Sequence, residues 1–132
     1  FHKKHMSDTD KQKVGALGEQ YVAAELVRRG HRILDRNYCR PWGELDVVSI
    51  YENCIHFVEV KTVTRVTFRD EGYEPFENIH MWKRKRLGRI VQTYLLDKKV
   101  GESMDWQIDA FSVVLDGIGG LVKMESLEDI LL

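Results

Sequence analysis

Two short apolar segments that each contain a carboxylate constrain this chain more than any other feature. Residues 45–51 and 55–61 are rich in Val, Ile and Leu, which favours β-strands, and Glu52 and Asn53 between them predict a hairpin turn. The first segment contains Asp46 and the second contains Glu59. Carboxylates inside a small sheet are costly unless they pair with a cation or bind one. We therefore expect two neighbouring strands whose acids form a site.

The residues after Glu59 extend this site. Side chains alternate along a strand, so Glu59 and Lys61 share a face and lie roughly 6.6 Å apart along it. Asp46 and Glu59 can hold a hard divalent cation, Mg²⁺ or Mn²⁺, and the backbone carbonyl of Val60 would add an oxygen ligand. Lys61 would orient or deprotonate a metal-bound water that attacks a phosphodiester. The competing interpretation is a surface ion pair between Glu59 and Lys61, which stabilises a protein little.

A helix is predicted over residues 11–29, because apolar side chains recur there at helical spacing. Asp8, Thr9 or Asp10 would cap its start, and Gly30 would end it. This helix also carries a carboxylate, Glu19, that we expect at the site. Glu19 lies on one helical line with apolar residues, so it would lean over the sheet toward the metal as a fourth site residue.

The remaining segments complete the order helix, three strands, helix, strand, strand. The connection 62–78 is polar and irregular, and a connection of this length is usually functional or mobile. Ser126 is predicted to cap a last helical turn. The other expected elements are a short strand near residues 33–38, a helix over 79–97, and strands over 106–115 and 121–124.

Length and composition limit the class of protein. The 132 residues suit one domain, which we place at residues 11–132 after a disordered or vector-derived tail at 1–10. No apolar run approaches the ~20 residues that cross a bilayer, so we expect a cytoplasmic protein with no membrane partner. Cys39 and Cys54 are too few for a disulfide framework and lack companions at zinc spacing.

The charge distribution allows two interpretations of the basic residues. The net charge of −1 is not that of a generic nucleic-acid binder, but basic residues concentrate in the second predicted helix. They form either a nucleic-acid contact or an ordinary solvated helix face. The residues concerned are Lys83, Lys85, Arg86 and Arg89.

Several blocks of this sequence resemble one family, the small YraN-type endonuclease-like proteins of the PD-(D/E)XK nuclease superfamily. The aspartate followed by Glu-x-Lys, with a glutamate in the helix before them, is the superfamily pattern. The similarity covers about residues 12–124. The blocks that carry it are Gly15, Gly18 and Glu19; Ile33, Leu34, Asn37 and Tyr38; residues 43–46; residues 57–62; residues 83–94; and residues 108–111.

The resemblance implies an α/β fold with a restriction-endonuclease-like core (αβββαβ), in which helices flank a mixed sheet of four to five strands. It implies metal-dependent hydrolysis of phosphodiester bonds, with Asp46 and Glu59 as metal ligands, Lys61 as the catalytic lysine and Glu19 as an accessory acid. The expected partner is nucleic acid, DNA rather than RNA, branched or single-stranded, and a homodimer is one option. Two alternatives stay open: an inactive nucleic-acid-binding or adaptor module of the same fold, and a structural domain whose acids pair with basic side chains.

Overall fold

The computed structural model describes residues 7–65 and 81–130, and over residues 81–85 it describes the helical backbone alone. Its strands form one mixed sheet in the order β1-β2-β3-β4-β5, in which β3 and β4 are parallel and the other neighbours are antiparallel. This confirms the predicted α/β class with a helix-flanked mixed sheet. The elements are α1 (Asp8–Arg28), β1 (Arg32–Arg40), β2 (Gly43–Tyr51), β3 (Cys54–Thr64), α2 (Met81–Asp97), β4 (Asp105–Leu115) and β5 (Leu121–Leu127).

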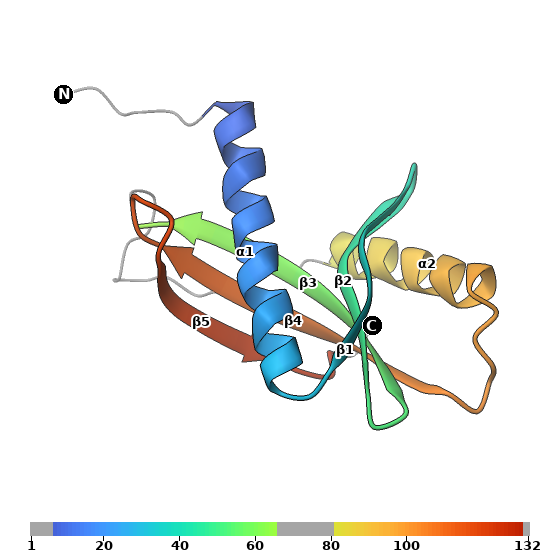
Figure 1. Ribbon diagram of the computed structural model, residues 1–132. Coiled ribbons are helices and arrows are strands. Elements are labelled where there is room, and N and C mark those ends of the chain that lie inside the picture. The colour runs from blue at the N-terminus through green and yellow to red at the C-terminus, as the bar shows by residue number, and fades with distance from the viewer. Residues whose placement is uncertain (1–6, 66–80, 131–132) are drawn as a thin grey trace.

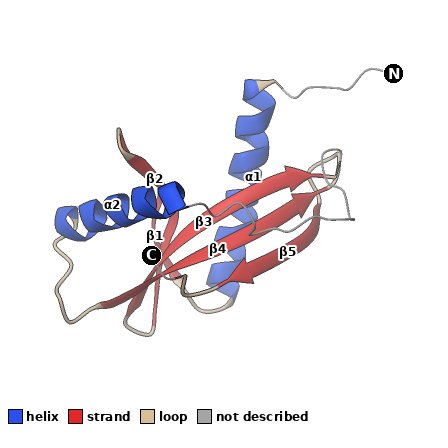
Figure 2. Ribbon diagram, turned by 180° about the vertical axis from the view of Figure 1, so that it is seen from behind, coloured by secondary structure: helices blue, strands red, loops and turns tan. Residues whose placement is uncertain are grey.

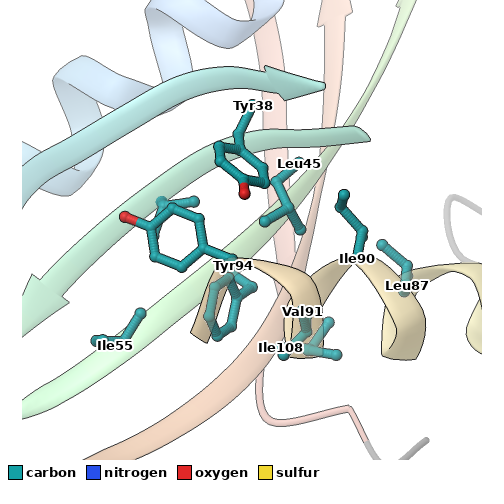
Figure 3. Close-up of a cluster of buried hydrophobic side chains, with 10 residues drawn as sticks. Tyr38, Leu45, Ile55, Leu87, Ile90, Val91, Tyr94 and Ile108 are labelled. Carbon is teal, nitrogen blue, oxygen red and sulfur yellow. The ribbon is translucent and has the colours of Figure 1, made fainter. Parts of the chain in front are cut away.

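The two helices cover opposite faces of the sheet (Figures 1 and 2). Val58 of β3 packs in a cluster with Val22 and Leu26 of α1. The neighbouring Phe57 packs in a second cluster with Tyr94 and other residues of α2. Figure 3 shows this cluster, with Tyr94 and Val91 of α2 among its labelled members. Because adjacent strand residues point to opposite faces, one helix lies on each side. Neither described helix has the length and apolar character needed to span a membrane.

The ends of α1 show one wrong prediction and one confirmed one. The cap is Ser7, whose Oγ accepts the N–H of Asp10 at 3.1 Å, and not Asp8, Thr9 or Asp10. The helix therefore starts three residues earlier than predicted, with two acids in its first turn, where the helix dipole favours negative charge. Gly30 ends the helix as predicted, with a φ of 99° that glycine adopts without strain.

The predicted role of Ser126 is wrong, because Ser126 lies in β5 opposite Phe111 of β4. The sheet ladder pairs residues up to Leu127, which leaves no helical cap at this position. The start of the predicted connection 62–78 also differs, since β3 continues to Thr64 opposite Leu115. The rest of that connection lies outside the described residues.

The hairpin turn between β2 and β3 is confirmed and fixes their register. Glu52 and Asn53 both have positive φ, 48° and 60°, as a two-residue hairpin turn of the right twist requires. Pairing then runs from Tyr51 opposite Cys54 to Val47 opposite Val58, and it ends there. Beyond this point β2 pairs with β1 alone, and the β1–β2 hairpin rises away from the rest of the sheet (Figure 1).

Gly18 allows α1 to approach β3 next to the predicted site. A Cβ at Gly18 would collide with the side chain of Thr62, whereas a Cβ at Gly15 on the same helix would meet nothing within 4 Å. We expect Gly18→Ala to lower the free energy of unfolding by about 1–3 kcal/mol. The matched control Gly15→Ala should be neutral or raise it by up to about 1 kcal/mol. Urea unfolding measures both, and equal stability of the two variants would contradict the close approach.

Candidate metal centre

Asp46 lies where β2 and β3 separate, and its side chain bridges the gap. Its Oδ2 accepts the backbone N–H of Val60 at 2.8 Å. Had the register continued past the pair Val47–Val58, Val60 would face the backbone of Leu45. The carboxylate thus replaces the missing strand as the partner of a backbone N–H. This bond holds Asp46 beside the residue that precedes Val60, which is Glu59.

The surroundings of Asp46 disfavour its negative charge. Burial raises the pKa of Asp46, and the charge of Glu59 raises it further, to about 7. The hydrogen bond from Val60 acts in the opposite direction, and Glu19 and Glu44 add smaller upward effects. The charges that act on Asp46 most strongly therefore all belong to carboxylates. Near neutral pH this site takes up a proton readily, and a cation would compete with that proton.

Glu19 reaches the same neighbourhood from α1. Its side chain is 14% exposed, and burial raises its pKa, while Arg36 lowers it. Glu44 and Glu59 act on Glu19 as they act on Asp46, by raising its pKa. The structure therefore brings the helical acid and the strand acids within electrostatic reach of one another.

Arg36 is a residue of this site that the sequence analysis misses. Its Nη2 lies 3.8 Å from Oε1 of Glu19, and it stands opposite Val47 in the β1–β2 ladder. The adjoining Asn37 has a φ of 53° at the position that faces Asp46, so β1 changes conformation at the same point as β2. Arg36 could have been found from the register of the β1–β2 hairpin, because pairing Arg40 with Gly43 places Arg36 opposite Val47, next to Asp46.

The ligands available to a cation are oxygens. Asp46 and Glu59 supply carboxylates, and Val60, whose N–H already holds Asp46, has a carbonyl for the role that the sequence analysis gives it. In the described part of the chain, no three His, Cys, Asp or Glu side chains are grouped so that they could hold one ion. Two carboxylates with water at the other positions suit Mg²⁺, which keeps several of its waters when it binds to proteins. The residues present therefore fit such an ion.

Lys61 and the basic helix lie around this centre. Lys61 is exposed, and strand alternation puts it on the same face as Glu59, opposite Ser112 of β4. Arg86 is exposed, and the guanidinium of Arg89 lies 4.9 Å from the ring centre of Trp42 in the β1–β2 hairpin loop. The side chains of Lys83 and Lys85, predicted to contact nucleic acid, lie outside the described residues.

Fold and site together define a class: an α/β domain with a five-stranded mixed sheet between two helices and acids at a strand divergence, consistent with a restriction-endonuclease-like core. Residues 18–115 match the family described as "Uncharacterised protein family UPF0102". The chain belongs to this family, and the membership confirms the YraN-like resemblance.

Relatives in several bacteria are similar to most of the chain. A UPF0102 protein of Alkaliphilus oremlandii is 39% identical over 97 residues, which is 74% of this chain and 79% of the relative. A UPF0102 protein of Corynebacterium efficiens is 36% identical over 123 residues, 92% of this chain and 94% of the relative. The names of these relatives assign no activity.

The raised pKa of Asp46 gives stability a pH dependence that can be measured. The unfolded chain ionises this group near its usual pKa of 3.8, whereas the folded protein does so near 7. The folded state therefore binds more protons between these values, and its free energy of unfolding falls as pH rises from about 4 to 7. We expect Asp46→Asn, which stays neutral, to remove about 1–3 kcal/mol of this fall.

Urea unfolding of both proteins without added metal, at intervals from pH 4.5 to pH 8, measures the effect. The Asn side chain can still accept the N–H of Val60, so the variant keeps the bridge and changes the charge. Parallel profiles for the two proteins would contradict the assigned pKa.

Proposed function

We propose that this protein is a Mg²⁺- or Mn²⁺-dependent endonuclease that hydrolyses phosphodiester bonds of DNA. The observation that carries the proposal is the half-buried carboxylate of Asp46, held beside Glu59 and raised in pKa to about 7. A folded protein that keeps two such acids together at neutral pH gains stability from a cation between them. Oxygen ligands select a hard divalent ion, and hydrolysis of a phosphodiester is the chemistry that such an ion supports.

Each residue of the site has a role in this proposal. Asp46 and Glu59 hold the ion, which when bound lowers the pKa of a water and stabilises charge on the phosphate. Val60 fixes the orientation of Asp46 through its N–H. Lys61, exposed and on the same face as Glu59, orients the attacking water or takes its proton. Glu19 is the accessory acid, and Arg36 offsets part of its charge.

The substrate proposed is DNA, branched or single-stranded, with the basic side chains of α2 as its contacts. Arg86 is exposed to solvent on this helix. Arg89 lies against Trp42, so the same surface combines positive charge with an aromatic ring. The helix backbone near Arg86 packs closely against Gly43 at the start of β2, which joins this surface to the strand that bears Asp46.

Isosteric variants of the two ligands test the proposal. Asp46→Asn and Glu59→Gln should each abolish Mn²⁺ binding in calorimetry and cleavage of DNA, because each removes one of two carboxylate ligands. Lys61→Ala should keep Mn²⁺ binding and lower kcat by about 10²-fold or more, since it removes proton transfer and not the ion. Circular dichroism checks that every variant is folded.

The matched control is Glu52→Gln, which changes an exposed glutamate in the turn at the other end of the β2–β3 hairpin and should leave both measurements unchanged. Cleavage is assayed on single-stranded, duplex, flap and four-way-junction DNA with Mg²⁺, Mn²⁺ or chelator. DNA binding that persists in chelator and never gives product would favour the inactive adaptor instead. Metal-dependent cleavage that survives in Asp46→Asn or Glu59→Gln would refute the assigned ligands.

A further inference from the structure

Among the described residues, the outer edge of β5 pairs with no other strand. Its inner edge pairs with β4 (Figure 2). Edge strands of this kind present backbone N–H and C=O groups that can pair with another chain. Three apolar side chains are also exposed along β5. Leu121 and Leu127 are 44% exposed, and Val122 is 39% exposed.

The opposite edge of the sheet, β1, has features that disfavour pairing with another strand. β1 contains four charged residues, a register irregularity between Ile33 and Asp35, and a left-handed backbone at Asn37. Each of these interrupts a regular hydrogen-bonding edge. β5 has two charged residues of opposite sign, and no residue within it has positive φ. Its register irregularity lies at Val122, and from Lys123 to Leu127 its pairing with β4 is regular. The two edges therefore differ in how readily they accept another strand.

The charges on β5 are arranged so that the strand is complementary to itself. Lys123 and Glu125 lie on the same face on either side of Met124, and Lys123 Nζ is 2.7 Å from Glu125 Oε1. If two copies pair antiparallel with Met124 opposite Met124, each Lys123 stands opposite Glu125 of the other copy. The four charges then alternate in sign around a square, which is the favourable arrangement for cross-strand pairs.

We propose that β5 pairs with β5 of a second copy of this chain in this register, so that two five-stranded sheets join as one sheet of ten strands. Charge selects the register. A shift of two residues in either direction, which keeps the same faces together, places Lys123 opposite Lys123 or Glu125 opposite Glu125, and like charges directly opposite are destabilising. Such a two-fold interface closes on itself and gives a dimer rather than a fibre. This dimer forms whether or not the protein cleaves nucleic acid.

Charge reversal tests both the interface and its register. We expect the unchanged chain to be dimeric at about 100 µM in light scattering coupled to gel filtration. Lys123→Glu and Glu125→Lys should each be monomeric there, because every cross-strand pair becomes repulsive. An equimolar mixture of the two variants should form a heterodimer, since each Glu of one chain then stands opposite a Lys of the other. Native mass spectrometry identifies it when one variant carries an isotope label.

The heterodimer separates a specific pairing from simple loss of structure. Both variants lose the ion pair within β5, so a fold defect would leave the mixture monomeric too. The double variant Lys123→Glu with Glu125→Lys restores the alternation and should be dimeric by itself. An unchanged chain that is monomeric at about 100 µM would overturn the proposal. A dimer that withstands both single reversals, or a mixture that stays monomeric, would overturn it as well.

Discussion

Where β2 leaves β3, the carboxylate of Asp46 accepts the backbone N–H of Val60, and the arrangement of the site depends on this bond. A strand that leaves its neighbour exposes backbone groups that need partners. A side chain supplies the partner here, so the divergence carries no unsatisfied N–H at Val60, and the same side chain is fixed beside Glu59. One hydrogen bond therefore satisfies the backbone N–H of Val60 and also positions Asp46 as a candidate ligand.

The hydrogen bond between Val60 and Asp46 also helps to explain why the pKa of Asp46 is raised. The carboxylate held in the gap between the strands is half-buried, and this loss of hydration is the largest cause of the raised pKa of Asp46. Glu19 comes close because Gly18 lets α1 lie against Thr62, the residue that follows Lys61. The ion pair with Arg36 offsets part of the charge of Glu19. The acids are therefore brought together by backbone geometry, and their mutual repulsion favours a cation.

Much of this arrangement could be predicted from the sequence, because local rules determine it. The Glu52–Asn53 turn set the β2–β3 register, and the apolar patterns located both helices and all five strands. Ser126 follows the end of the apolar pattern at residue 124, which favours a helix cap there, whereas pairing with Phe111 of β4 extends the strand past it. Arg36 gives no signal of its own in the sequence, since its partner Glu19 belongs to another element. Contacts between distant segments were the information that one sequence read locally lacks.

A cation site at the divergence of β2 and β3 is tested most directly by anomalous diffraction at the manganese absorption edge. Crystals grown with Mn²⁺ should show one strong peak between the carboxylates of Asp46 and Glu59, with the carbonyl of Val60 as a further ligand. Crystals of Asp46→Asn under the same conditions should lack the peak. A manganese peak elsewhere with none at this position, or Asp46 and Glu59 bound only by protein groups at saturating Mn²⁺, would contradict the account.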